Sequence, residues 1–90
     1  MDGSAVHIVV RGCVQGVFFR ASTQSKANEF SLAGWVCNRS DGTVEIHAEG
    51  EKGKLDHFID WCRQGPPSAQ VSKLDLDWTD PQGLHDFEVR

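Results

Sequence analysis

The sequence predicts an α/β (α+β) sandwich in which two helices cover one face of an antiparallel sheet. Three observations lead to this prediction. A β-branched alternating segment runs through a short loop into a helix, a hairpin signal follows, and a clearly amphipathic helix precedes further alternation. The chain has 90 residues, of which 39% are hydrophobic, as is ordinary for a globular domain. We therefore expect a single domain over residues 1–90.

A strand and a helix are predicted before residue 31. Val6, Ile8 and Val10 alternate with other residues within the β-branched segment 5–11, which is the pattern of a strand with one buried face. Residues 20–30 contain neither Gly nor Pro and carry a thin stripe of small and apolar residues at helical spacing. The chain therefore opens with a strand–loop–helix unit.

A hairpin is predicted next. Residues 33–39 and 44–49 both have strand character, and Ser40-Asp41-Gly42 forms the turn between them, because glycine tolerates the positive φ of tight hairpins. Apolar residues in the second strand alternate with acidic residues and His47. We therefore expect His47 on the solvent-facing side of the sheet.

The second helix is the clearest element in the chain. Its apolar residues recur at i, i+3, i+4 and i+7, and they are Leu55, Phe58, Ile59 and Cys62. Gly65-Pro66-Pro67 ends this helix. Residues 71–78 predict a fourth strand with a bulge where the apolar parity shifts, and the alternation in 85–90 fits a short fifth strand. The order β-α-β-β-α-β is the ferredoxin-like arrangement.

Composition excludes several classes of partner. The net charge of −4 argues against nucleic acid, because that affinity depends on Lys and Arg that neutralise phosphates. No window approaches the roughly 20 apolar residues of a membrane span, and the start lacks the basic residues of a signal peptide.

Three cysteines without a C-x-x-C pair indicate free thiols and a cytoplasmic location. The four histidines share no metal-ligand spacing, so we expect no metal and no cofactor.

The loop before the first helix suits an anion. It leads to a helix N-terminus, where unpaired N–H groups and the helix dipole favour negative charge, and Gly12 and Gly16 permit unusual backbone conformations. Arg20, at the head of the helix, can donate two parallel hydrogen bonds to a phosphate. In a ferredoxin-like sheet the first two strands end at the same edge, so we expect Asn38 to face this loop. A plain connection with a solvated arginine is the alternative.

Cys13 suggests a different interpretation of this loop, in which a thiolate attacks a bound phosphate. A cysteine-phosphatase loop has five residues between its Cys and its Arg, whereas six separate Cys13 from Arg20. Phe19 stands where that scheme requires the arginine, and cysteine is commonly just a buried residue. We therefore expect a phosphate cradle that supplies no protein nucleophile.

Two segments resemble the signature segments of the acylphosphatases, and they are GCVQGVFFR (residues 12–20) and GWVCNRSDGTVEIHAEG (residues 34–50). The resemblance extends through GPPSAQVSKLD and covers essentially the whole chain. It implies a ferredoxin-like fold and hydrolysis of the carboxyl–phosphate anhydride of small acyl phosphates to a carboxylate and inorganic phosphate. It also implies that the reaction uses no metal and forms no covalent enzyme intermediate.

The resemblance further implies roles for particular residues. In the family, one arginine and the loop amides bind the phosphate, and one asparagine positions the attacking water. These roles correspond to Arg20, to Asn38 and to the backbone of the loop residues Val14, Gln15, Gly16, Val17, Phe18 and Phe19. The expected partners are a small acyl phosphate and the product phosphate, and we expect the chain to act as a monomer.

Three alternatives remain at this stage. One is a non-catalytic ferredoxin-like module that binds a small anion. Another is an RNA-binding sheet, which the acidic and non-aromatic face expected at Thr43, Glu45, His47 and Glu49 disfavours. A third is a carbamoyl-phosphate-processing domain of the kind attached to larger maturation proteins.

Overall fold

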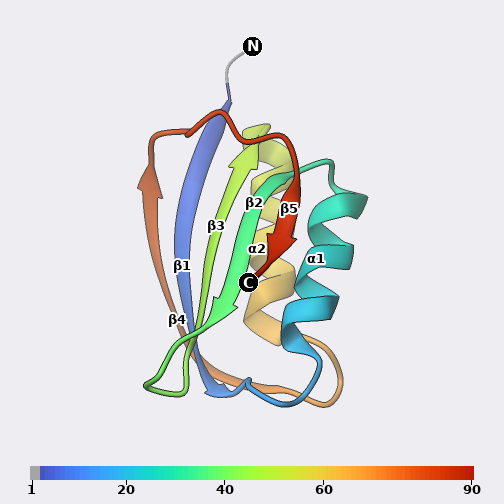
Figure 1. Ribbon diagram of the computed structural model, residues 1–90, viewed down its shortest axis with the longest axis vertical. Helices are drawn as coiled ribbons and strands as arrows, with labels where there is room; N and C mark the ends of the chain where they lie inside the picture. Colours follow the sequence, from blue (N-terminus) through green and yellow to red (C-terminus); the bar gives the residue numbers. More distant parts are fainter. Residues whose placement is uncertain (1–2) are drawn as a thin grey trace.

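The computed structural model describes residues 3–90 and contains five strands and two helices. They are β1 (Ser4–Cys13), α1 (Phe19–Glu29), β2 (Ala33–Asn38), β3 (Val44–Gly50), α2 (Lys52–Gln64), β4 (Gln70–Thr79) and β5 (Phe87–Val89). The strands form one sheet in the order β4-β1-β3-β2-β5, and both helices pack on the same face of it (Figure 1). The predicted ferredoxin-like sandwich is therefore confirmed. Neither helix is long and apolar enough to cross a membrane.

The expectation of a purely antiparallel sheet is wrong, because β5 pairs with β2 in the parallel sense. The chain leaves β4 at one edge of the sheet and crosses its end before β5 adds to the opposite edge (Figure 1). After that crossing β5 runs in the same direction as β2, with Gly34 opposite Phe87 and Val36 opposite Val89. The alternation in the last residues indicated a strand but carried no information on its partner.

The core lies between the sheet and the two helices. The predicted stripe of α2 is buried, and so is the predicted face of β1. The largest fully buried side chains are those of Phe19, Phe58, Ile8, Ile46, Leu55, Val6, Val10, Val14, Val36, Val44, Thr23 and Cys62. Two of these residues lie at the ends of the connection between β1 and α1, since Val14 begins the loop and Phe19 is the first residue of α1. The core therefore holds both ends of this connection.

The bulge predicted in the fourth strand is present. Arg11 pairs with Lys73 and Gly12 pairs with Val71, so that Ser72 is an extra residue on β4. Gly12 has a φ of 130°, and a side chain there would collide with the carbonyl oxygen of Gln70. The close approach of β4 at this point therefore requires glycine just where β1 gives way to the loop.

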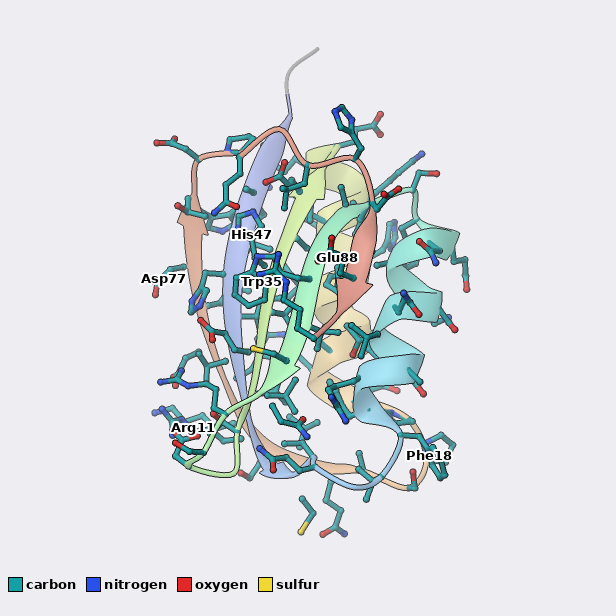
Figure 2. The ribbon with its side chains drawn as sticks, in the orientation of Figure 1. Arg11, Phe18, Trp35, His47, Asp77 and Glu88 are labelled. Carbon is teal, nitrogen blue, oxygen red and sulfur yellow. The ribbon has the colours of Figure 1, made fainter. Side chains whose placement is uncertain are left out.

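The expectation that His47 lies on the surface is wrong. The residue is 2% exposed, and its side chain shares a 2.6 Å hydrogen bond with that of Glu49, which is also buried. Trp35 stacks on the His47 ring (Figure 2). Glu49 also accepts hydrogen bonds from the backbone N–H groups of residues 82–84, so the crossing segment is tied over this part of the sheet. Alternation correctly placed His47 on the face away from the helices but could not show what covers it.

Candidate active site

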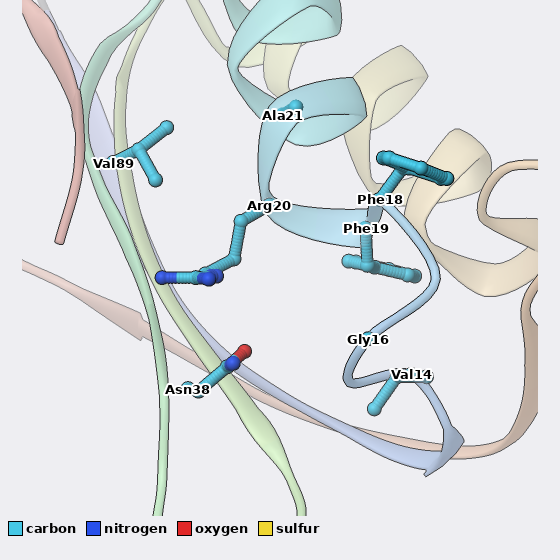
Figure 3. A pocket seen from close by; sticks show the side chains of 8 residues that line it. All are labelled: Val14, Gly16, Phe18, Phe19, Arg20, Ala21, Asn38 and Val89. Carbon is cyan, nitrogen blue, oxygen red and sulfur yellow. The ribbon is translucent and has the colours of Figure 1, made fainter.

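The loop after β1 and the end of β2 enclose a pocket of about 300 Å³. Its walls are formed by Val14, Gly16, Phe18, Phe19, Arg20, Ala21, Asn38 and Val89 (Figure 3). The structure thus brings Arg20 and Asn38 together, as the parallel course of β1 and β2 predicted. Four of the six predicted loop residues line the pocket, whereas Gln15 and Val17 do not.

The backbone of the loop is shaped to present N–H groups. Gly16 has a φ of 74° and Phe18 a φ of 64°, so two left-handed residues turn the chain sharply before α1 begins. The first turn of α1 has no side-chain cap and no acidic residue. Its free N–H groups and the helix dipole therefore remain available to an anion in the pocket.

The loop is fixed at three points. The side chain of Val14 is buried in the core. The Gln15 side-chain amide donates one hydrogen bond of 2.7 Å to the carbonyl oxygen of Arg39 and another of 2.8 Å to that of Thr43. The Ser68 hydroxyl donates a 2.7 Å bond to the carbonyl oxygen of Val17. A loop held in this way keeps its amides in position before any ligand arrives.

Arg20 is held across the pocket by the residue that follows β5. Its Nη1 donates a 3.0 Å hydrogen bond to the carbonyl oxygen of Arg90, whose own N–H donates to the carbonyl oxygen of Val36. No Asp or Glu side chain is among the described residues that line the pocket. The planar guanidinium has further N–H donors with which to bind phosphate oxygens.

Asn38 approaches from the opposite wall. It is the last residue of β2 and lies on the same side of the strand as buried Val36, which is the side that faces the helices. Its side chain is exposed and extends toward the space below the Arg20 guanidinium (Figure 3). A side-chain amide carries both donor and acceptor atoms, so Asn38 can orient a water molecule in this space.

The hairpin turn that follows Asn38 is rigid. The Asp41 carboxylate accepts hydrogen bonds from the Thr43 backbone N–H at 3.0 Å and from the Thr43 hydroxyl at 2.6 Å. The hydroxyl bond contributes most to lowering the pKa of Asp41 below its ordinary value. The Arg39 N–H closes the turn on the Thr43 carbonyl oxygen at 2.9 Å. The position of Asn38 is therefore set by both the sheet and the turn.

Cys13 is exposed and does not line the pocket. The interpretation of its thiol as a nucleophile therefore has no geometric support. Within residues 3–90, no three His, Cys, Asp or Glu side chains come together as a metal site requires.

Sequence reasoning missed two contributions to this site. Val89 and Arg90 belong to it only because β5 adds beside β2, which alternation alone does not reveal. Gln15 was counted only for its backbone, whereas its side-chain amide binds the hairpin turn. Hydrogen bonds from a side-chain amide to carbonyl oxygens far away in the sequence leave no sequence pattern, so this role could not be predicted.

Comparisons with known proteins identify relatives of this chain. A family model described as Acylphosphatase matches residues 6–89. Acylphosphatases of Haloquadratum walsbyi and Gloeobacter violaceus are 45% and 49% identical over 93% and 92% of this chain, covering 90% and 89% of their own lengths. The solved acylphosphatase structure from Coxiella burnetii superposes with a TM-score of 0.95 at 42% identity, over 99% of this chain and 94% of that chain.

Proposed function

The chain belongs to the acylphosphatase family and hydrolyses acyl phosphates, and we propose that Arg20, Asn38 and the amides of residues 14–19 perform this reaction. One observation carries the assignment to these residues. Arg20 at the start of α1 and Asn38 at the end of β2 border a single pocket together with Gly16 of the loop. No observation favours the non-catalytic anion-binding alternative.

The phosphoryl group is held by positive charge and by N–H donors. In the proposed complex, the Arg20 guanidinium and the loop amides bind the phosphoryl oxygens that carry charge in the transition state. Their positions are supported by the bonds of Gln15, Ser68 and the Arg90 carbonyl, which hold the loop and the guanidinium in place. Donors that are already positioned need no reorganisation as the charge shifts.

Water is the nucleophile. The Asn38 amide holds a water molecule in line with the bond between phosphorus and the acyl oxygen. A new bond forms from the water oxygen to phosphorus, the bond from phosphorus to the acyl oxygen breaks, and its electron pair leaves on the carboxylate. The water proton passes to a phosphoryl oxygen. Because a carboxylate is a good leaving group, the site needs positioning and charge stabilisation more than a strong base.

Neither a metal ion nor a covalent intermediate takes part in this scheme. Arg20 and the amides meet the charge of the phosphoryl group, and the exposed Cys13 thiol lies outside the pocket. We also propose a cytoplasmic location, which the free thiols of Cys13, Cys37 and Cys62 support. A monomer is the proposed active form, because one chain supplies every wall of the pocket; activity proportional to enzyme concentration checks this.

The place of attack tests the proposal directly. We expect benzoyl phosphate hydrolysed in ¹⁸O-labelled water to give labelled inorganic phosphate and unlabelled benzoate, because water attacks phosphorus. Label in the benzoate indicates attack at the carbonyl carbon and contradicts the scheme. Hydrolysis no faster than the uncatalysed reaction contradicts catalysis at this pocket altogether.

A further inference from the structure

Two of the three large exposed hydrophobic residues of the described chain border this pocket. The three residues are Phe18, 79% exposed, Val89, 41% exposed, and Trp78, 45% exposed. Phe18 and Val89 both border the pocket, whereas Trp78 lies elsewhere with the Lys52 ammonium 5.1 Å from its ring centre. Apolar side chains that border a pocket are typical of small-molecule binding sites.

We propose that Phe18, Ala21 and Val89 form a binding site for the acyl group and give the enzyme a preference for acyl phosphates whose acyl group is apolar and uncharged. This inference rests on the proposed function, because it takes Arg20, Asn38 and the loop amides as the site of the phosphoryl group. It goes further by assigning a chemical class to the other half of the substrate.

The pocket has both polar and apolar walls. In Figure 3, Val89 and Phe18 lie on either side of Ala21, with the Arg20 guanidinium and the Asn38 amide below them. A volume of about 300 Å³ leaves room for more than a phosphoryl group. Small-molecule sites usually combine apolar walls with a few polar groups that fix orientation, which is the composition found here.

The packing of the folded chain does not explain why a phenylalanine occupies position 18. Phe18 is one of two non-glycine residues with positive φ in the described chain, and this conformation is unfavourable for a bulky side chain. Its ring gains little from burial, because most of it faces solvent. Glycine would fit this backbone better and expose less apolar surface. A contact with substrate gives the phenyl ring a role that its packing does not.

Val89 extends the apolar core into the pocket. It lies two residues beyond Phe87 on the same face of β5, and Phe87 is buried against the helices. Ala21 on α1 also borders the pocket and has only a small side chain, and Val89 is exposed there. An apolar acyl group placed there would cover the exposed face of Val89.

The charges around the pocket disfavour an anionic acyl group. Arg20 is the single cation among the described lining residues, and the phosphoryl group occupies it in the proposed complex. The nearby Arg90 side chain lies over the Trp35 ring, 5.0 Å from its centre, and pairs with Glu88. A carboxylate on the acyl group would therefore meet apolar side chains and lose hydration without gaining a partner.

Matched substrates and variants test this inference. The value of kcat/KM is measured for benzoyl phosphate, acetyl phosphate and 4-carboxybenzoyl phosphate, and inorganic phosphate is used as a competitive inhibitor. The variants are Phe18→Gly, Val89→Thr and their combination, because threonine preserves the shape and strand preference of valine and glycine suits the backbone at position 18. Trp78→Gln, which removes exposed apolar surface away from the pocket, is the control.

The native enzyme should prefer benzoyl phosphate to both other substrates. The double variant should lower the ratio of benzoyl to acetyl kcat/KM by roughly tenfold, the scale of a small change in apolar contact. Val89→Thr, which leaves the phosphate-binding loop untouched, should lower this ratio without changing the inhibition constant for phosphate, which shows that the phosphoryl site is intact in that variant. The control should retain the native ratio.

An unchanged ratio in both Val89→Thr and the double variant overturns the acyl site while leaving the proposed function in place. A native preference for the carboxylated substrate overturns it equally. Failure of the native chain to hydrolyse any of the three substrates contradicts the proposed function instead, so the two failures are distinguishable.

Discussion

The side-chain amide of Gln15 donates a 2.8 Å hydrogen bond to the carbonyl oxygen of Thr43, joining the loop after β1 to the hairpin turn after β2. The same amide also binds the carbonyl oxygen of Arg39, the residue that follows Asn38. The N–H groups of the Gln15 side chain therefore connect the loop after β1 to the segment that contains Asn38. We therefore expect this connection to set the distance between the proposed phosphoryl site and the proposed water site.

Gln15→Ala is expected to lower kcat for benzoyl phosphate by about 10²-fold, because a small shift between binding groups disturbs the attacking geometry. The inhibition constant for inorganic phosphate should change much less, because the loop keeps its Val14 and Ser68 anchors. Steady-state kinetics with phosphate inhibition measure both quantities. Gln64→Ala, an exposed glutamine on α2, is the control and should retain the native kcat. Equal loss of kcat and of phosphate binding would show that Gln15 merely supports the loop.

Arg20→Ala is expected to reduce kcat/KM by more than about 10³-fold, since it removes preorganised donors together with the positive charge of the pocket. Arg20→Lys should recover only part of this loss, because an ammonium lacks the planar pair of donors that matches a phosphate. Phosphate inhibition should weaken in both variants. Arg63→Ala on α2 serves as the control, and native kinetics in Arg20→Lys would exclude two-point binding by the guanidinium.

Cys13→Ser is expected to leave kcat and KM within about twofold of their native values, because the thiol is exposed and lies outside the pocket. Rapid-quench experiments should likewise detect no phosphorylated protein during turnover. A loss of activity in Cys13→Ser comparable to that in Arg20→Ala would restore the interpretation of Cys13 as a nucleophile.

Glu49 should make the folded state sensitive to acid. Burial tends to raise the pKa of its carboxyl, but hydrogen bonds from the Gln82 N–H, His47 and the Leu84 N–H outweigh burial and hold this pKa below the ordinary value of 4.5. The resulting stabilisation is complete above pH 4.5 and is lost as the pH falls below it toward the lowered folded-state pKa.

Glu49→Gln is therefore expected to lower the free energy of unfolding at pH 7 by about 1.5–3 kcal/mol, the scale of hydrogen bonds to a charged group. Urea titrations between pH 3 and 7 check this prediction, and they should show a weaker acid dependence in the variant. Exposed Glu51→Gln is the comparison variant. An identical acid dependence in Glu49→Gln and the native chain would assign the effect to other carboxyl groups.

Local patterns were enough to predict the elements and the outline of the site. Alternation identified β1, the stripe at i, i+3, i+4 and i+7 identified α2, and Asp41-Gly42 located the hairpin turn. Topology then brought Arg20 and Asn38 to the same edge of the sheet. These features depend on residues that are neighbours in sequence or on strand directions that the order of elements determines.

Features that depend on contacts between segments far apart in the sequence could not be predicted. The parallel pairing of β5 follows from the path of the chain across the sheet, and with it come the contacts of Val89 and Arg90. His47 is buried because Trp35 stacks on it and because the crossing segment is tied to Glu49. Each of these requires knowing which distant segment covers a given face, and periodicity does not contain that information.

Hydrolysis of benzoyl phosphate in excess EDTA, by the native chain and by Asn38→Ala, tests the central claim most directly. We expect fast native hydrolysis that EDTA does not slow and a loss of at least about 10²-fold in Asn38→Ala, because the water loses its positioning group. Asn28→Ala, an exposed asparagine on α1 away from the pocket, should match the native rate. A native rate abolished by EDTA, or an Asn38→Ala variant as active as the native chain, would contradict metal-free attack by a water that Asn38 holds.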